Sequence, residues 1–193
     1  MESIQLAADV QRLMESLGQL PEPVANPVLV AVSGLPGTGK SYFSTKLAEK
    51  LPFVILESDT LRKVLFSPPT YTARESASLF QAIHCLIERL LKKGISLILD
   101  ATNLSESHRE HLEHIAEQSG AKLVLVSVEA PPAIVQARLK ARAGSRQHQS
   151  DADWSVYQKM KLYVEAIRRK HYAVDTSRDI APVLEKIARE VRH

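Results

Sequence analysis

The chain has 193 residues, of which 45% are hydrophobic and 24% charged, so it is long enough and apolar enough to form one compact domain. This composition excludes intrinsic disorder, collagen-like repeats and disulfide scaffolds, and the one cysteine, Cys85, cannot form an internal disulfide. Lysine and arginine exceed aspartate and glutamate by only 25 − 22 = 3, which does not by itself indicate a nucleic-acid partner. We see no export signal and no apolar run that could span a membrane, so we expect a cytoplasmic protein without a membrane partner.

Residues 3–17 have the pattern of an amphipathic helix. Four apolar residues recur there at spacings of three and four: Leu6, Val10, Leu13 and Leu17. Three prolines between residues 21 and 27 then predict an extended linker. We therefore interpret residues 1–26 as a helix and proline-rich linker on the outside of a main domain, residues 27–193. The sequence leaves the role of this helix open.

Short runs of β-branched and leucine residues follow the linker, and they are apolar throughout, as expected of strands covered on both faces. They span residues 28–33, 53–56, 95–99, 123–128 and, more weakly, 173–174. Helical patterns follow these runs at residues 40–50, 76–93, 105–118, 132–142, 153–169 and 180–191. This alternation predicts an α/β fold, a parallel sheet with helices on both faces, in which ligands bind at the carboxyl ends of the strands.

A glycine-rich loop follows the first expected strand. It has the sequence Gly34-Leu35-Pro36-Gly37-Thr38-Gly39-Lys40-Ser41, which matches the phosphate-binding pattern G-x-x-x-x-G-K-[ST] between a strand and a helix. Backbone N–H groups of such a loop, together with the amino terminus of the following helix, surround a phosphate. We expect Lys40 to reach the β- and γ-phosphates of ATP and the Ser41 hydroxyl to ligate Mg²⁺. The sequence does not distinguish ATP from GTP.

Acidic residues follow the next two expected strands. Asp59 comes directly after the second strand, and Arg62 lies three residues later on the same helical face. Asp100 ends the third strand, and we expect it to hold Mg²⁺ directly or through water. No glutamate follows Asp100, which disfavours a motor or switch ATPase and favours phosphoryl transfer to an acceptor hydroxyl.

The basic residues are concentrated between residues 134 and 171, where the net charge is 9 − 3 = +6. Arg138 and Arg142 share a helix face there, and a polar loop follows them. We interpret residues 138–153 as a lid whose arginines stabilise charge on the phosphates. The alternative interpretation is a solvated basic helix.

These motifs together resemble one branch of the P-loop kinases, which includes polynucleotide 5′-hydroxyl kinases, zeta toxins, chloramphenicol phosphotransferase and gluconate kinase. The resemblance covers residues 28–176, from the phosphate loop through S-D-x-x-R and D-A-T-N to R-x-x-x-R. It implies the P-loop NTPase fold, a five-stranded parallel sheet of order 2-3-1-4-5 with a helical lid. Tyr42 stands where the family usually has threonine, at a position in the phosphate loop that is not a metal ligand.

The resemblance also implies a role for each matching residue. Asp59 would orient the acceptor hydroxyl or accept its proton, and Arg62 would bind a substrate anion beside it. Asp100 would support Mg²⁺ or brace Arg62, and the roles of Asp59 and Asp100 are interchangeable at this point. Arg138 and Arg142 would be lid arginines.

The expected function is transfer of the ATP γ-phosphoryl group to a hydroxyl of a small molecule: a metabolite, an antibiotic or a nucleotide sugar. Two alternatives stay open, a polynucleotide 5′-hydroxyl kinase and a non-catalytic ATP-binding regulator. The presence of Asp59 and Arg62 favours an enzyme, because a protein that only senses nucleotide needs no acid and arginine to bind a phosphoryl acceptor. Residues 67–76 are expected to border the acceptor pocket, with Tyr71 and Arg74 as contacts. The acceptor and the oligomeric state are not determined by the sequence.

Overall fold

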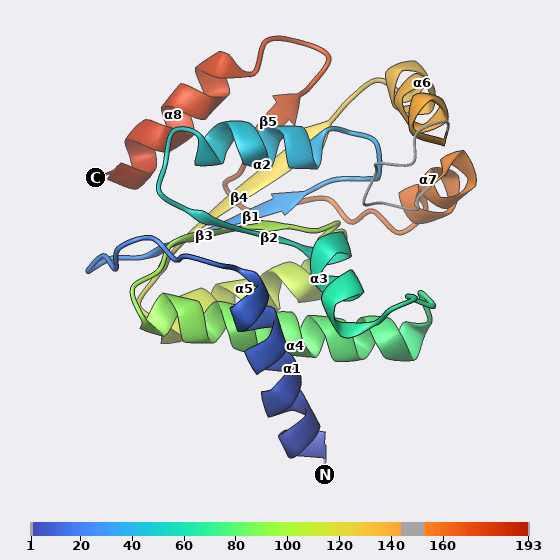
Figure 1. The fold of residues 1–193 in the computed structure, drawn as a ribbon. Helices are drawn as coiled ribbons and strands as arrows, with labels where there is room; N and C mark the ends of the chain where they lie inside the picture. The colour runs from blue at the N-terminus through green and yellow to red at the C-terminus, as the bar shows by residue number, and fades with distance from the viewer. Residues whose placement is uncertain (1, 144–152, 193) are drawn as a thin grey trace.

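The computed structural model describes residues 2–143 and 153–192, which form a twisted parallel sheet between two layers of helices (Figure 1). The strands are β1 (Val28–Ser33), β2 (Val54–Glu57), β3 (Leu97–Asp100), β4 (Lys122–Glu129) and β5 (Tyr172–Asp175). Their order is β2-β3-β1-β4-β5 and every pairing is parallel, which confirms the predicted fold class. The carboxyl ends of all the strands therefore meet at one edge of the sheet.

Each strand of the described residues is followed along the chain by at least one helix. They are α1 (Glu2–Ser16), α2 (Lys40–Ala48), α3 (Ser58–Leu65), α4 (Ala73–Lys92), α5 (Glu106–Gln118), α6 (Pro132–Ala143), α7 (Trp154–Lys161) and α8 (Ala181–Arg192). None of them is long and apolar enough to cross a membrane.

One predicted helix is shorter than expected. The pattern over 153–169 predicts a single helix, but α7 ends at Lys161. The segment beyond it is held by a distant part of the chain instead, because the Glu165 N–H donates to the Leu104 carbonyl at 3.0 Å. The buried Arg109 guanidinium also donates to the carbonyls of Glu165 and Ala166. These bonds replace the intrahelical ones, so the helical prediction was wrong beyond residue 161.

Two hydrophobic cores lie on opposite faces of the sheet. Helices α2 and α8 cover one face, and α1, α4 and α5 lie on the other (Figure 1). Alternate residues of β1 serve the two cores: Val30 and Val32 pack toward α2, whereas Leu29 and Ala31 pack toward α4. Every residue of β1 is buried, which explains the uninterrupted apolar run in the sequence.

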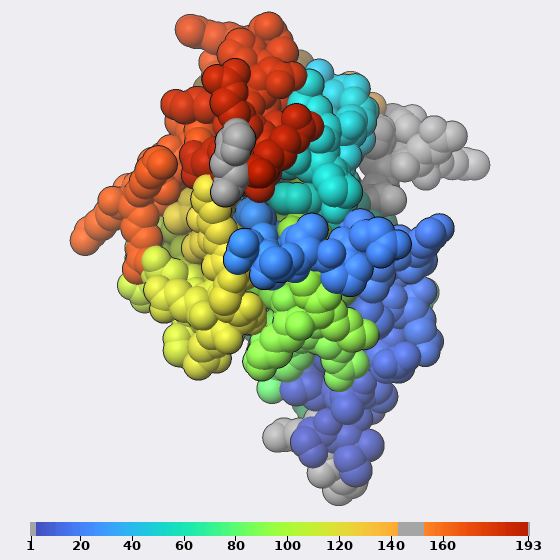
Figure 2. Space-filling model, turned by 90° about the vertical axis from the view of Figure 1, so that its left-hand side faces the viewer, coloured from blue at the N-terminus to red at the C-terminus, as the bar shows by residue number. Residues whose placement is uncertain are grey.

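Helix α1 contributes directly to the second of these cores. Val10 and Leu13 are almost completely buried among residues of α4 and α3. The linker after α1 crosses the amino-terminal end of the sheet as a narrow band (Figure 2). A hydrogen bond of 2.8 Å from the Val24 N–H to the Gly94 carbonyl fixes this band. The amphipathic pattern of α1 therefore reflects packing within the chain's own core.

Candidate active site

The phosphate loop leaves the carboxyl end of β1 and leads directly into α2. Gly39 precedes that helix with φ +99°, a left-handed conformation that residues with a side chain rarely adopt. A Cβ atom at Gly34 would lie 2.4 Å from the Val128 carbonyl oxygen, so the loop packs against β4 too closely for any side chain. Within the loop, the Thr38 hydroxyl donates to the Leu35 carbonyl at 2.8 Å. The fold and these contacts give the loop the shape of an anion cradle.

Lys40 lies half-buried at the base of this loop. Its Nζ donates to the Leu35 carbonyl at 3.2 Å. Burial lowers the pKa of Lys40 below its ordinary value, while the carboxylates of Asp100 and Asp59 counteract the shift. A phosphate anion placed in the loop would add a further negative charge beside this ammonium group and so stabilise its protonated form.

Two carboxylates meet at the ends of neighbouring strands beside Ser41. Glu57 ends β2 and Asp100 ends β3, and the strand register pairs them directly. Asp100 is only 3% exposed and its Oδ2 has no hydrogen-bond partner among the described residues. Burial raises the pKa of Asp100, against the opposing effects of Lys40 and the Ser41 hydroxyl. A buried carboxylate oxygen without a partner, next to a second carboxylate and a hydroxyl, fits a Mg²⁺ site.

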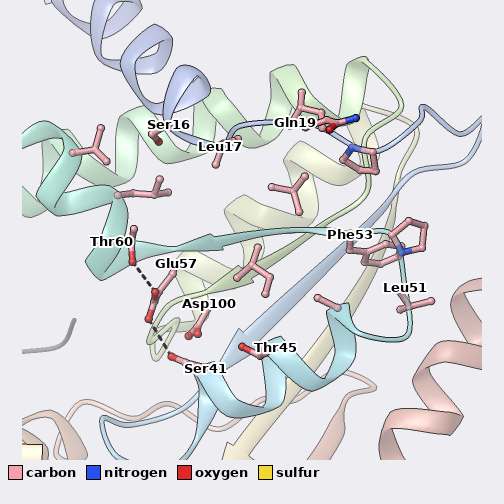
Figure 3. A pocket seen from close by; sticks show the side chains of 18 residues that line it. Ser16, Leu17, Gln19, Ser41, Thr45, Leu51, Phe53, Glu57, Thr60 and Asp100 are labelled. Atoms are coloured by element: carbon pink, nitrogen blue, oxygen red, sulfur yellow. Dashed lines mark hydrogen bonds between the residues drawn. The ribbon is translucent and has the colours of Figure 1, made fainter. Parts of the chain in front are cut away.

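Glu57, to which the motifs assign no role, also belongs to this site. The Ser41 hydroxyl donates to Glu57 Oε1 at 3.2 Å and the Thr60 hydroxyl donates to Glu57 Oε2 at 2.7 Å (Figure 3). A groove of about 780 Å³ beside β2 also reaches Ser41, Glu57 and Asp100. The signal for Glu57 was present in the sequence, because it ends an apolar strand as Asp100 does.

A cleft of about 500 Å³ at the carboxyl edge of the sheet brings most of the predicted residues together. The predicted site residues that line it are Pro36, Gly37, Gly39, Lys40, Ser41, Asp59, Arg62, Asp100 and Arg142. Tyr71, predicted as an acceptor contact, also lines the cleft. Gly34, Leu35, Thr38, Tyr42, Arg74 and Arg138 do not line it.

Arg62 reaches the cleft, but its guanidinium is engaged by the protein itself. Nη1 donates to Glu75 Oε1 at 2.6 Å, and both side chains are more than nine-tenths buried. Nη2 donates to the Ser76 hydroxyl at 3.2 Å. The buried Nε of Arg62 has no hydrogen-bond partner among the described residues. The binding of a substrate anion by Arg62, which the family resemblance implies, stays a prediction.

The two arginines expected in a lid have different surroundings. Arg142 lies close enough to Lys40 for its charge to lower the pKa of that lysine, and it lines the cleft. Arg138 instead donates to the Thr176 hydroxyl at 2.8 Å and to the Gly37 and Thr38 carbonyls at 3.4 and 3.3 Å. It therefore fastens the outside of the phosphate loop to the segment after β5. Residues 144–152 of the predicted lid lie outside the described residues.

We predict that Arg138→Ala weakens the binding of a non-hydrolysable ATP analogue by about ten-fold, because the loop loses charge-assisted hydrogen bonds to its carbonyls. Titration calorimetry measures this affinity. Lys140→Ala, an exposed change on the same helix, is the matched control and should leave it unchanged. Unchanged affinity combined with lost turnover would instead support the predicted lid role for Arg138.

Much of the basic charge after α7 is paired with nearby acidic residues. Arg169 forms ion pairs with three glutamates of α5: Glu106, Glu110 and Glu113. Lys170 lies 3.7 Å from Glu190 of α8. Two of the nine basic residues counted between 134 and 171 are therefore paired with acidic side chains.

A parallel sheet in this order, with a phosphate loop after the first strand and acids at the ends of the next two, defines the P-loop kinase class of α/β proteins. Residues 29–167 match a family described as an AAA domain, and the chain belongs to that family. This confirms the P-loop kinase branch predicted from the motifs.

The chain is also similar to individual kinases. It is 32% identical to the L-seryl-tRNA(Sec) kinase of Methanococcus maripaludis over 54% of this chain and 42% of that protein. It is 29% identical to the adenylyl-sulfate kinase of Myxococcus xanthus over 61% of this chain and 69% of that protein. The chain thus spans less than half of the seryl-tRNA kinase. A gluconokinase structure from Sinorhizobium meliloti shares the fold, with a TM-score of 0.60 and 22% identity over 86% of this chain and 96% of its own.

Proposed function

We propose that the protein is an ATP-dependent kinase that transfers the γ-phosphoryl group to a hydroxyl of a small molecule. The observation that carries this proposal is the shared cleft: Lys40 of the phosphate loop, Asp59 of α3 and Asp100 of β3 line one cavity. The loop side holds a triphosphate, and the remaining volume beside Asp59 admits a second molecule. A cleft that has room for both a triphosphate and a second molecule supports phosphoryl transfer between two bound substrates.

Each residue has a role that its position supports. Ser41, Asp100 and Glu57 would hold Mg²⁺, which when bound offsets the negative charge of the β- and γ-phosphates. Lys40 and Arg142 place positive charge where the transferred group carries negative charge. Asp59 orients the acceptor hydroxyl and accepts its proton. Catalysis is then mainly positioning and charge stabilisation, because the loose transition state requires little from a base.

Two observations favour a small acceptor over a polynucleotide 5′ end. The basic residues Arg169 and Lys170 are paired with glutamates, which reduces the charge available to a nucleic-acid backbone. The cleft has a volume of about 500 Å³, the size of a pocket for a small molecule. The matched relatives are named for very different acceptors, so the family does not select one.

The test is ADP release measured with Mg·ATP alone, with pooled hydroxyl metabolites and with 5′-hydroxyl oligonucleotides. We expect stimulation by at least one metabolite pool and none by the oligonucleotides. Stimulation by the oligonucleotides alone would establish the polynucleotide kinase instead. Nucleotide binding with no stimulated release by any acceptor would favour the non-catalytic regulator.

A further inference from the structure

The part of the cleft away from the phosphate loop carries four large aromatic or apolar side chains beside polar ones such as Asp59 and Arg62. Tyr71 before α4, Phe80 of α4, and Val156 and Met160 of α7 line it. These side chains come from three separate segments, which are the residues before α4, α4 itself and α7, and together they give this part of the cleft an apolar wall. Such walls contact the body of a ligand, while a few polar groups fix its orientation.

The one cation on this side, among the described residues that line the cleft, is enclosed by protein groups. Arg62 donates to Glu75 and Ser76, and its Cζ lies 5.0 Å from the centre of the Tyr71 ring. Its side chain is 9% exposed. A ligand in this part of the cleft therefore meets the ring of Tyr71 beside a guanidinium whose charge is balanced by Glu75 and whose buried Nε has no hydrogen-bond partner among the described residues.

Glu75 is itself held firmly in its charged form. Its Oε2 accepts hydrogen bonds from the Thr70 N–H and the Thr70 hydroxyl, both at 2.7 Å, and its Oε1 accepts one from the Tyr71 N–H. Burial alone would raise the pKa of Glu75, but the bonds from Thr70, Arg62 and Tyr71 hold it at about 2. Glu75 therefore stays ionised, and a ligand carboxylate cannot displace it without breaking this network.

The other charges around the cleft also oppose an anion here. Asp59 lines the acceptor half and carries a negative charge of its own. The remaining cations of the described lining, Lys40 and Arg142, lie together at the phosphate loop, where they face the triphosphate. A carboxylate, sulfate or phosphate group in the acceptor half would be desolvated beside Asp59 with no free cation among the described lining residues, which is unfavourable.

We infer that the acceptor is an alcohol with an apolar or aromatic body and no anionic group, and that the Arg62–Glu75 pair enforces this choice. The inference rests on the proposed kinase function and narrows its substrate class. It sets this chain apart from kinases of sugar acids or of adenylyl sulfate, whose acceptors are anionic. In this role Arg62 is a positioning residue that holds Tyr71 and α4 in place.

The test uses two acceptors of nearly the same size and shape, the uncharged hydroxymethyl-benzamide and the anionic hydroxymethyl-benzoate. Their binding to the full chain loaded with Mg²⁺ and a non-hydrolysable ATP analogue is measured by calorimetry, and their stimulation of ADP release is measured with ATP. We expect the affinity for the uncharged amide to be at least about ten-fold higher than the affinity for the benzoate. Equal or tighter binding of the benzoate would overturn the inference.

A variant separates the charge of the pair from the shape of the pocket. Glu75→Gln removes the charge that balances Arg62, so the preference should move toward the benzoate by about ten-fold or more. Glu88→Gln, an exposed change on the same helix, is the matched control and should keep the wild-type preference. An unchanged preference in folded Glu75→Gln would contradict the role given to the pair. The wild-type comparison decides the acceptor class even where this variant does not fold.

The binding and turnover measurements also separate this inference from the proposed function. A binding preference for the amide without stimulated ADP release would overturn the kinase proposal while supporting the charge class of the ligand. Stimulated release by the benzoate, with none by the amide, would support the kinase and overturn the inference.

Discussion

Replacing Lys40 by alanine should lower acceptor-stimulated ADP release by about a hundred-fold or more. The ammonium group lies in the loop beside Asp100 and Asp59, where its positive charge would act on the phosphates during transfer. Its bond within the protein is to the Leu35 carbonyl, so its loss should change the folded structure little. The measurement is initial-rate ADP release, together with the thermal midpoint followed by circular dichroism.

The matched control for this variant is Lys46→Ala. Lys46 lies in the last turn of the same helix, where it pairs with Glu49 at the surface. Its removal should leave turnover within about two-fold, because an exposed pair of this kind contributes little to stability. Turnover in Lys40→Ala equal to that of the wild type would remove the phosphate-site interpretation altogether.

The sheet and the phosphate loop were predictable because their signals are local. Each strand contains a run of apolar residues, and the loop between the first strand and α2 carries its glycines at fixed spacing. Gly39 has a positive φ and Gly34 packs directly against β4, so the glycines follow from the backbone conformation that the loop requires. A local backbone requirement of this kind is visible in the sequence of one chain.

The hydrogen-bond partners of the predicted site arginines are not predictable from local sequence signals. Arg62 pairs with Glu75 thirteen positions later, and Arg138 bonds with Thr176 thirty-eight positions later. Nothing in the spacing of the sequence indicates that these groups meet, because the contacts depend on how α3 packs on α4 and how α6 lies beside β5. The end of α7 was missed for the same reason, since Arg109 of α5 holds the segment that follows it.

The role of the residue that ends β2 lies between these two cases, because it depends on strand order as well as on the local sequence. The motifs predict functions for Asp59 and Arg62 after this strand but none for Glu57, the residue that ends it. The parallel register makes Glu57 the direct neighbour of Asp100, and both carboxylates lie beside the Ser41 hydroxyl. The predicted strand order alone would have placed them together, because β2 and β3 are adjacent in it.

Asp59→Asn should lower phosphoryl transfer by about a hundred-fold or more while the affinity for Mg²⁺ and a non-hydrolysable ATP analogue stays within about three-fold. The reason is position: Asp59 is on α3, after the strand end, whereas Glu57 and Asp100 are the paired carboxylates beside Ser41. Asparagine keeps the size of the side chain but cannot accept the hydroxyl proton. Turnover is measured by ADP release and affinity by calorimetry.

Asp100→Asn gives the contrast that decides between the two acids. Its buried Oδ2 has no partner among the described residues, so its loss should weaken binding of the Mg²⁺–nucleotide complex by about ten-fold or more. Asp9→Asn on α1, far along the chain from the cleft and paired with Arg12, serves as the control for a removed carboxylate. A large loss of nucleotide affinity in Asp59→Asn, with normal affinity in Asp100→Asn, would exchange the two roles. The acceptor side would then lie at the end of β3, and the metal side at the start of α3.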